Sequence, residues 1–491
     1  MTTLRTKILA NKSDIIWRLI AILYTLYLVH LHFIRLNDFN LWSDECFSVN
    51  LARQGFWGMI DGTANDVHPP LYYIVIIILN KILGESGFSL HLSAFIFYIA
   101  SLIFILTVIW KNFGKEVSLL MITLCSLTTT SIRYNVEVRM YSLAFFMCML
   151  AFWGLYVIIN DSTKYSGYIY LIIGSLGAAY SHYYGLFSVF YLYITLFILV
   201  LIKKVPVKNL IITYIITVLG YLPWLSKLIT TFSTTSQSYW MTDYSHFTDC
   251  IQSFYPYPID AISYFMFLLT IVVVLYSIYT DFKNKEINDF KLSSTTLWMI
   301  CGMFAIFATI LTGILVSEFI HPSFVTRYLY PITSACWLIL CVGLSKVTIR
   351  NTYHIGKIFL LVLVVFCFII YKPIYNYYYT SETNEEILFT NTLSEMNSLI
   401  TPNDIFLTDY LHYEITIIGT YFPENEHYLI DSSFDSFQDG IQYWYLSTNV
   451  LSDDFIDMFT RNGYTCDQII ENGSLGTLPT HFYRLAKNNQ N

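Results

Sequence analysis

The sequence predicts an α-helical polytopic membrane protein with about eleven transmembrane helices and a small C-terminal α/β domain. Of the 491 residues, 55% are hydrophobic and only 12% are charged. That charged share is roughly half of what an ordinary soluble domain carries. The mean hydropathy is +0.54. The apolar residues gather in long runs, whereas the last part of the chain is mixed and polar.

The transmembrane helices are expected where apolar runs are long enough to cross a bilayer, which takes roughly 17 to 25 residues. Such a segment crosses as a helix because its backbone N–H and C=O groups are then hydrogen-bonded internally. The first run follows Arg5, Lys7 and Lys12 and lacks a small-residue cleavage site, so we expect a retained anchor. The expected spans are residues 15–36, 91–110, 116–132, 138–159, 167–180, 185–202, 210–224, 262–279, 296–316, 328–344 and 355–371.

Basic residues predict the orientation of these helices, because lysine and arginine concentrate in cytoplasmic loops. If the N-terminus is inside, five basic clusters all fall in cytoplasmic loops. The alternate loops contain almost no lysine and hold acidic, histidine and arginine residues instead. We therefore expect a multi-pass plasma-membrane protein whose active site is extracytoplasmic. The basic clusters lie at residues 111–115, 164, 203–208, 283–291 and 346–350.

The apolar run at residues 71–83 is too short to cross the bilayer comfortably. If it did cross, Lys111 and Lys115 would move outside and Glu137 inside. We therefore expect a helix that lies at the outer membrane interface. The number of spans is then odd, which places the C-terminus outside as well.

A change in composition predicts two domains. Residues 1–374 are expected to form the transmembrane domain, and residues 375–491 an extracytoplasmic α/β domain that has no spanning run. Within the second domain, residues 405–408 and 427–430 are expected to be strands, with a helix after Asp409.

The first external loop contains adjacent carboxylates in the segment Trp42-Ser43-Asp44-Glu45. The simplest interpretation is a solvated loop that keeps a helix end out of the lipid. The functional interpretation is a general base near a partly desolvated cavity, where burial raises the pKa of a carboxylate. Later in the loop, Asp66-Val67-His68 precedes Pro69-Pro70. This proline pair is expected to start the next helix with His68 at its mouth.

Two external sites near helix ends combine ionisable and aromatic residues. Glu137 and Arg139 lie within one turn of a span's outer end, where either a local ion pair or a substrate path would fit. His182 lies in the tight turn at residues 181–185. A histidine there either hydrogen-bonds the turn or takes part in catalysis.

A further external site lies before the tenth expected span, where Arg327 begins an apolar run near Glu318 and His321. A guanidinium at this position needs an anion, and its planar fork matches a phosphate bidentately. Two carboxylate sites, two arginines and several histidines thus share one side of the bundle. This set suits transfer from a lipid-anchored phosphate, in which arginine neutralises the leaving phosphate and a carboxylate deprotonates the acceptor.

Six motifs, in this order and over about residues 15–345, resemble the membrane glycosyltransferases of the GT-C superfamily. The resemblance is strongest to the bacterial branch related to protein O-mannosyltransferases and the aminoarabinose transferase of lipid A. The matching segments are Asp44-Glu45, His68-Pro69-Pro70-Leu71-Tyr72-Tyr73, Glu137-Val138-Arg139-Met140-Tyr141-Ser142-Leu143, Ser181-His182-Tyr183-Tyr184-Gly185, Leu222-Pro223-Trp224, and Arg327-Tyr328 before Pro331.

The resemblance implies a GT-C fold, a polyprenyl-phosphate-linked sugar as donor, and an inverting single displacement at the external face. By position, it implies that Asp44 is the first candidate for the general base, with Glu45 as the alternative. It also implies that Glu45 and Glu137 shape the acceptor site. Some branches use a divalent metal, and Asp44 with Glu137 could hold one, so the need for a cofactor is left open. The resemblance further implies that Arg139 and Arg327 bind the donor phosphate, while His68, Tyr141, His182 and Tyr328 line the pocket.

The acceptor is expected to be an extracytoplasmic glycan, lipid or protein, and no nucleic-acid partner is expected. The loop at residues 226–258 carries Tyr239, Trp240, Asp243 and Tyr244. Such residues suit contact with a sugar, but an ordinary amphipathic loop on the bilayer fits equally well.

Two alternative functions use the same carrier lipids. An envelope polysaccharide polymerase would share the carrier chemistry. A lipid-linked oligosaccharide transporter or flippase would be expected to show repeated halves and ionisable groups near the bilayer midplane. Here the charges lie at the external ends of the spans and no repeat is visible.

Overall fold

The structure is a computed structural model that describes residues 2–64, 68–235, 244–257, 259–283, 292–320, 322–348 and 354–487. Within these ranges the chain is mostly helical, with one five-stranded sheet near the C-terminus. Several positions considered above lie outside the described residues: Asp66, Val67, Tyr239, Trp240, Asp243, His321, and residues 284–291 and 349–353 of two basic loops.

The chain divides by contact into two compact units. Unit 1 consists of Met1–Leu36, Ile60–Val75 and His91–Tyr375, and unit 2 of Asn37–Met59, Ile76–Leu90 and Asn376–Asn491. The C-terminal part of unit 2 therefore packs with segments that lie far earlier in the sequence. The division into a transmembrane domain at residues 1–374 and an extracytoplasmic domain at residues 375–491 stays a prediction.

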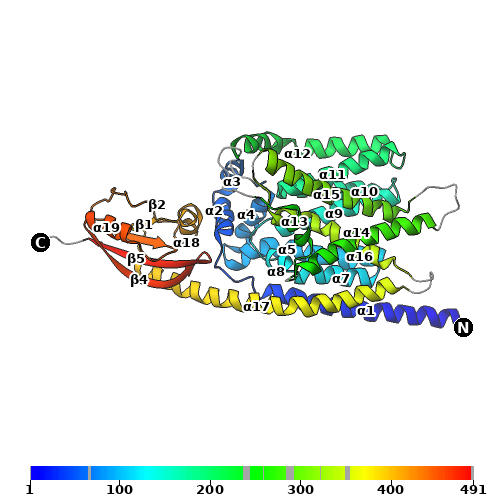
Figure 1. Ribbon diagram of the computed structural model, residues 1–491, viewed down its shortest axis with the longest axis horizontal. Helices are drawn as coiled ribbons and strands as arrows, with labels where there is room; N and C mark the ends of the chain where they lie inside the picture. The colour runs from blue at the N-terminus through cyan, green and yellow to red at the C-terminus, as the bar shows by residue number, and fades with distance from the viewer. Residues whose placement is uncertain are drawn as a thin grey trace. The chain divides into compact units, whose positions relative to one another are not determined.

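Unit 1 is a bundle of helices joined by short connections, in which α9, α10, α11 and α15 pack side by side (Figure 1). Its helices are α1 (Thr2–Phe33), α6 (Trp110–Phe113), α7 (Lys115–Leu127), α8 (Thr129–Tyr134), α9 (Tyr141–Asn160), α10 (Tyr165–Ser181), α11 (Tyr183–Leu201), α12 (Val207–Thr235), α13 (Phe247–Phe254), α14 (Asp260–Lys283), α15 (Ser294–Phe319) and α16 (Tyr330–Ser345). A π-helical turn, Ile105–Ile109, precedes α6, and a 3-10 turn, Thr326–Leu329, precedes α16.

Nine of the described helical segments are long and apolar enough to cross a membrane, as a polytopic membrane protein requires. They coincide with nine of the eleven expected spans. The other two expected spans are also helices but are shorter, since α7 has 13 residues and α10 has 17. A break at Thr128 separates α7 from α8, so the apolar run that predicts one span there forms two helices.

The helices of unit 1 differ in how deeply they are buried. The most apolar stretch of Thr326–Ser345 is 94% buried, whereas that of Val207–Ile229 is 11% buried. The first segment is therefore a core helix, and the second presents apolar residues to its surroundings, as a lipid-facing helix does. Glycines bring α9 and α10 into backbone contact. A Cβ added at Gly174 would lie 2.4 Å from the backbone nitrogen of Ala151.

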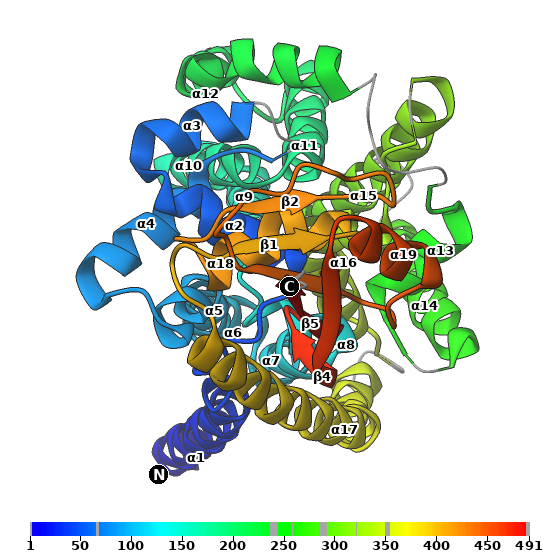
Figure 2. The same cartoon turned by 90° about the vertical axis from the view of Figure 1, so that its left-hand side faces the viewer.

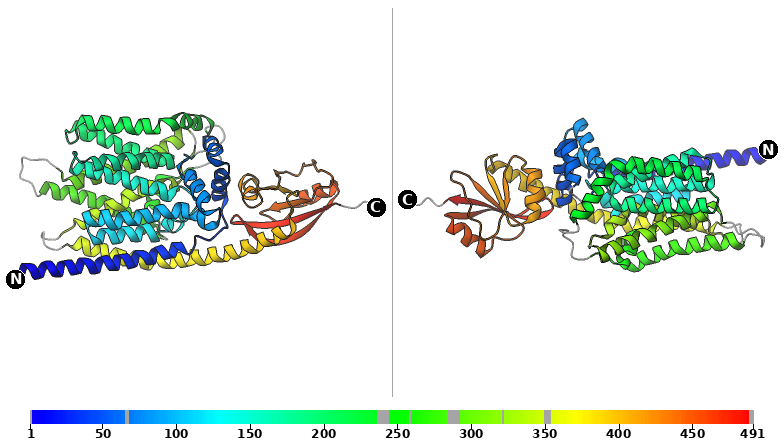
Figure 3. Two further views of the ribbon diagram at one scale, coloured as in Figure 1. Left: turned by 180° about the vertical axis from the view of Figure 1, so that it is seen from behind. Right: turned by 90° about the horizontal axis from the view of Figure 1, so that it is seen from above.

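Four helices have residues in both units. They are α3 (Gly55–Ala64), α4 (Leu71–Leu83), α5 (Gly87–Phe104) and α17 (Ile355–Leu399). The short apolar helix α4 begins directly after Pro70, whose carbonyl accepts from the Ile74 amide at 3.2 Å. This confirms the expected helix start. Helix α17 is continuous through Pro373 and extends well beyond the expected end at residue 371 (Figure 3).

Unit 2 also contains α2 (Ser43–Arg53), α18 (Ile418–Tyr421) and α19 (Asp453–Arg461), with a π-helical turn, Tyr413–Ile417, before α18. Its sheet has the order β2-β1-β3-β5-β4, and β1 is parallel to both of its neighbours (Figure 2). The last two strands form a hairpin whose turn residues Gly476 and Thr477 both have positive φ. The strands are β1 (Ile405–Thr408), β2 (His427–Leu429), β3 (Tyr443–Ser447), β4 (Tyr464–Leu475) and β5 (Leu478–Lys487).

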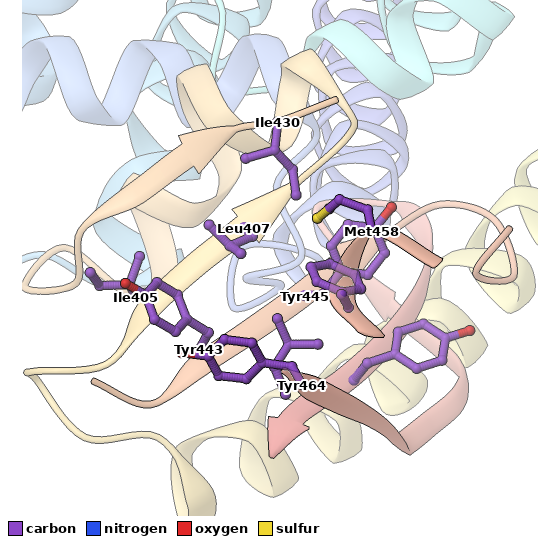
Figure 4. Packing of buried hydrophobic residues seen from close by; sticks show 10 residues of the cluster. Ile405, Leu407, Ile430, Tyr443, Tyr445, Met458 and Tyr464 are labelled. Carbon is purple, nitrogen blue, oxygen red and sulfur yellow. The ribbon is translucent and has the colours of Figure 1, made fainter. Parts of the chain in front are cut away.

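The sheet of unit 2 packs one face against α19. Ile405 and Leu407 of β1 are two positions apart, so both point to this face. There they join a hydrophobic core that also includes Tyr445 and Met458 (Figure 4). Phe406 points to the opposite face, where its ring lies 4.9 Å from that of Phe422. The two strands expected here are confirmed. The helix expected after Asp409 is split into the π-helical turn and α18, and β3, β4, β5 and α19 are additional.

Candidate functional site

The loops that precede α4 and α9 meet through a hydrogen bond between two buried side chains. Arg139 is 2% exposed and His68 is 8% exposed. The Arg139 Nη2 group lies 3.2 Å from Nε2 of His68. A guanidinium can only donate, so Nε2 of His68 must accept and the imidazole proton must lie on Nδ1.

His182 links the end of α10 to the start of α11 in an extended conformation, and it lies just outside both helices. Its Nδ1 accepts a hydrogen bond from the Tyr184 amide at 3.0 Å, so the proton of the neutral ring lies on Nε2. Burial lowers the pKa of His182 well below its ordinary value of 6.5, and the guanidinium charges of Arg139 and Arg327 lower it further. Among the described residues, the buried Nε2 group has no hydrogen-bond partner.

Aromatic rings join these residues into one group. The His182 ring centroid lies 5.9 Å from that of His68, 6.0 Å from that of Tyr141 and 4.9 Å from that of Tyr328. The Arg327 guanidinium lies 5.7 Å from the ring centroid of Tyr328. We refer to these residues as the Arg–His cluster, which consists of His68, Arg139, Tyr141, His182, Arg327 and Tyr328.

The Arg–His cluster presents positive charge and proton donors. The hydroxyl of Tyr141 is buried and, within the described ranges, has no hydrogen-bond partner. The charges that act on this hydroxyl include the guanidinium groups of Arg327 and Arg139. Two guanidinium groups beside an imidazole N–H and a phenol O–H are complementary to an anion with several oxygens, such as a phosphate.

Glu137 lies two residues before Arg139 and is 4% exposed. Its carboxylate accepts from Nε of Arg133 at 3.1 Å. Glu137 therefore has a local ion-pair partner, but that partner is Arg133, whereas the pair considered from the sequence joins Glu137 to Arg139. Arg133 was missed, although its spacing of four residues from Glu137 is that of neighbours on a helix surface.

Asp44 and Glu45 lie in the first turn of α2, which belongs to unit 2. The two carboxylates differ in their surroundings. Glu45 is 6% exposed, and its Oε2 accepts from the Trp42 amide at 3.2 Å, so it caps the helix. Asp44 is more exposed, and its backbone carbonyl accepts from the Ser48 hydroxyl at 3.0 Å.

The remaining external candidates have local partners. The Tyr244 hydroxyl donates to Glu318. Asp249 accepts from the His246 amide at 2.9 Å, which caps α13. Within the part of the chain that the structure describes, no three His, Cys, Asp or Glu side chains gather as metal ligands would. This observation does not test a site made by Asp44 and Glu137 alone, so their binding of a metal stays a prediction.

The fold matches solved structures over almost the entire chain. ArnT from Cupriavidus metallidurans in the apo state aligns with a TM-score of 0.59 at 11% identity, covering 97% of this chain and 98% of ArnT. This chain has the GT-C fold. The GT-C fold was expected from the motifs and is confirmed.

The same GT-C protein, ArnT from Cupriavidus metallidurans bound to undecaprenyl phosphate, aligns with a TM-score of 0.58 at 11% identity. This alignment covers 95% of this chain and 98% of ArnT. The Archaeoglobus fulgidus oligosaccharyltransferase, in complex with Zn and sulfate, aligns at 12% identity with a TM-score of 0.47, covering 94% of this chain and 72% of that chain. No protein-family profile matches the sequence, and no curated protein matches it by sequence.

Proposed function

We propose that this protein is a membrane glycosyltransferase. It transfers a sugar from a polyprenyl-phosphate-linked donor to an extracytoplasmic glycan, lipid or protein, with inversion at the anomeric carbon. The observation that carries this proposal is the Arg–His cluster, which gathers two arginines and two buried proton donors from separate parts of unit 1. Neither donor has a hydrogen-bond partner among the residues that the structure describes. The GT-C fold and the undecaprenyl phosphate bound to ArnT support the choice of a lipid phosphate.

The Arg–His cluster is proposed to bind the donor phosphate. Arg139 and Arg327 neutralise its charge, and the Tyr141 hydroxyl and His182 Nε2 donate to its oxygens. His68 orients Arg139 by accepting from the guanidinium, and Tyr328 lines the pocket beside Arg327. Negative charge grows on the phosphate as the glycosidic bond breaks. These groups therefore stabilise the departing phosphate more strongly than they stabilise the intact donor.

Asp44 is proposed as the general base. Glu45 is less suited to that role, since its carboxylate already caps α2. Asp44 would take the proton of the acceptor hydroxyl while the hydroxyl oxygen bonds to the anomeric carbon. The bond between that carbon and the phosphate oxygen breaks, and the polyprenyl phosphate leaves. Glu137 is proposed to shape the acceptor site.

The membrane orientation is part of the proposal. Lys115 begins α7, Lys164 precedes α10, and Lys203 and Lys204 follow α11. His182 lies at the opposite end of α10 and α11 from these lysines. With the lysines in the cytoplasm, the Arg–His cluster is extracytoplasmic.

Lipid binding tests the proposal directly. The full chain in nanodiscs is titrated with undecaprenyl phosphate and, separately, with undecaprenol, which lacks the phosphate. We expect tighter binding of the phosphate, and a loss of about 10- to 100-fold in Arg139→Gln and in Arg327→Gln, because each removes a charge-assisted contact. Arg461→Gln is the matched control, since Arg461 is exposed and donates within α19. Equal binding of both lipids by the wild type would reject the phosphate site.

A further inference from the structure

The segment before α2 is fastened by the side chain of Tyr421, at the end of α18. The Tyr421 hydroxyl accepts from the Leu41 amide at 2.7 Å and donates to the Phe39 carbonyl at 2.9 Å. The Tyr421 ring lies edge-on to Phe39 at 5.8 Å and 5.1 Å from the ring of Phe389 in α17. The side chain of Tyr421 therefore holds the Leu41 amide and the Phe39 carbonyl by hydrogen bonds, and it packs against the Phe39 ring.

Two more groups from the C-terminal part of unit 2 hold the same segment. The Glu386 carboxylate accepts from the amides of Phe39 and Asn40 at 3.0 and 2.9 Å. The amide of Thr477, in the β4–β5 turn, donates to the Asn40 side chain at 2.9 Å. Three consecutive amides, those of residues 39–41, are thus bonded by side chains that lie about 340 to 380 positions later in the sequence.

The other end of α2 is held by the same part of the chain. Asn50 donates to the Thr416 carbonyl at 2.8 Å, and Thr420 donates back to the Asn50 side chain at 3.3 Å. Arg53 donates to the carbonyls of Gly419 and Thr420, both at 3.0 Å. These carbonyls lie in the last turn of α18, so the positive charge of Arg53 also lies at the negative end of that helix. Helix α2 is therefore attached at both ends.

A short path of contacts leads from Tyr421 to Asp44. Leu41 accepts from the Cys46 thiol at 3.2 Å, and the Trp42 carbonyl accepts from the amides of Glu45 and Cys46 at 2.8 and 2.9 Å. The first turn of α2 is thus built on the backbone of residues 41 and 42. Asp44 lies within that turn, so a shift at Leu41 would move its carboxylate.

We propose that the C-terminal part of unit 2 is a positioning element for α2, and that Tyr421 is the positioning residue that sets the place of Asp44. This inference rests on the proposed function, since it assigns Asp44 the role of base. Tyr421 touches no reacting atom and acts through the backbone of residues 39–42. The C-terminal part of unit 2 is therefore required for the reaction step itself, beyond any part that it plays in binding the acceptor.

The Tyr421 hydroxyl is suited to this task at all working pH values. Burial raises its pKa well above 10, so it keeps its proton. It therefore continues to donate to Phe39 while it accepts from Leu41. Loss of this one oxygen removes both contacts and leaves the ring packing in place.

The test compares Tyr421→Phe with Tyr428→Phe in the full chain. Tyr428 lies in the same part of the chain, and among the described residues its hydroxyl donates only to Glu426, at 2.9 Å. The first measurement is hydrogen–deuterium exchange of the peptide covering residues 38–46. We expect faster exchange in Tyr421→Phe and wild-type exchange in Tyr428→Phe. Glu386→Gln, which weakens the neighbouring contacts, should show the same change as Tyr421→Phe.

The second measurement is turnover with undecaprenyl-phosphate-linked sugars in membranes. We expect kcat of Tyr421→Phe to fall about 10- to 100-fold with KM for the donor unchanged, because misplacing a reacting group by about 1 Å costs on that order. Unchanged exchange together with unchanged kcat would overturn the inference. A rise in KM with kcat preserved would also overturn it, since that result assigns the contacts to binding.

The two proposals fail in distinguishable ways. If Asp44→Asn keeps wild-type turnover, the base assignment fails, and Tyr421 then positions α2 without positioning a base. If Asp44→Asn is inactive while Tyr421→Phe exchanges and turns over as the wild type does, the positioning role fails and the proposed function stands.

Discussion

The guanidinium of Arg139 donates to Nε2 of His68 at 3.2 Å, across 71 positions of the sequence. Both side chains are buried, and they come from the loops that precede α4 and α9. This contact holds the two loops together and sets the tautomer of His68.

Replacing His68 by leucine should destabilise the protein, because a buried guanidinium then loses an acceptor. The expected loss is about 1–3 kcal/mol. Thermal unfolding of the full chain in detergent measures it. His68→Gln should recover most of that loss, since an amide oxygen can accept in place of Nε2. If the leucine and glutamine variants unfold at the same temperature, the hydrogen bond contributes nothing measurable.

The two adjacent carboxylates of α2 should respond differently to loss of charge. Asp44→Asn should lower kcat by about 10²- to 10⁴-fold, the usual contribution of a general base. Glu45→Gln should keep most of the activity, because glutamine can still accept from the Trp42 amide as a cap. Turnover and correct insertion are measured for both. The reverse order of effects would assign the base to Glu45.

His182 makes the stability of the protein depend on pH. Its pKa in the folded state lies well below 6.5, so at lower pH the unfolded chain binds a proton that the folded chain does not. Stability from this group is therefore complete above pH 6.5 and falls as the pH drops below that value, by at most about 1.4 kcal/mol per pH unit.

The control for this pH dependence is His182→Asn, which can still accept from the Tyr184 amide as a helix cap but does not titrate. Unfolding temperatures are compared between pH 7.5 and 5.5. The variant should lose less stability than the wild type over that range. Parallel curves for the two proteins would contradict the predicted role of His182.

Contact between α9 and α10 should make Gly174 intolerant of a larger residue. A Cβ there would lie 2.4 Å from the Ala151 nitrogen and 2.6 Å from the Met147 carbonyl oxygen, and neither backbone atom can move alone. Gly174→Ala should cost about 1–3 kcal/mol. At Gly220 a Cβ would meet only the end of the Leu176 side chain, so Gly220→Ala is the matched control. Thermal unfolding that ranks Gly220→Ala as the more harmful change would contradict this packing.

The proposed orientation predicts the location of two fusion reporters. A reporter fused after Lys204, in the connection between α11 and α12, should report a cytoplasmic location. One fused after Asn403, just before β1, should report an extracytoplasmic location. Alkaline phosphatase and green fluorescent protein fusions measure the two. The opposite pattern would reverse the bundle and place the Arg–His cluster in the cytoplasm.

Much of unit 1 could be predicted from the sequence alone. Long apolar runs form helices in a membrane because each backbone group can be paired within its own segment, and this is a local property. The start of α4 after Pro70 and the turn at His182 are local features for the same reason. The resemblance to GT-C proteins also rests on short motifs, and it named all six residues that the fold gathers into the Arg–His cluster.

Tertiary structure decided the relationships that depend on distant parts of the chain. The pairing of β3 with β5 and the attachment of α2 by Tyr421 and Glu386 join segments with no shared local pattern. The difference between Asp44 and Glu45 was also hidden in the sequence, because adjacent carboxylates look alike until the helix start at Trp42 assigns one of them to the cap. Apolar length and turn chemistry thus determined where most helices of unit 1 lie. Only the folded chain decided which side chains meet, because hydrogen bonds and ring contacts between distant segments form only after their backbones are packed.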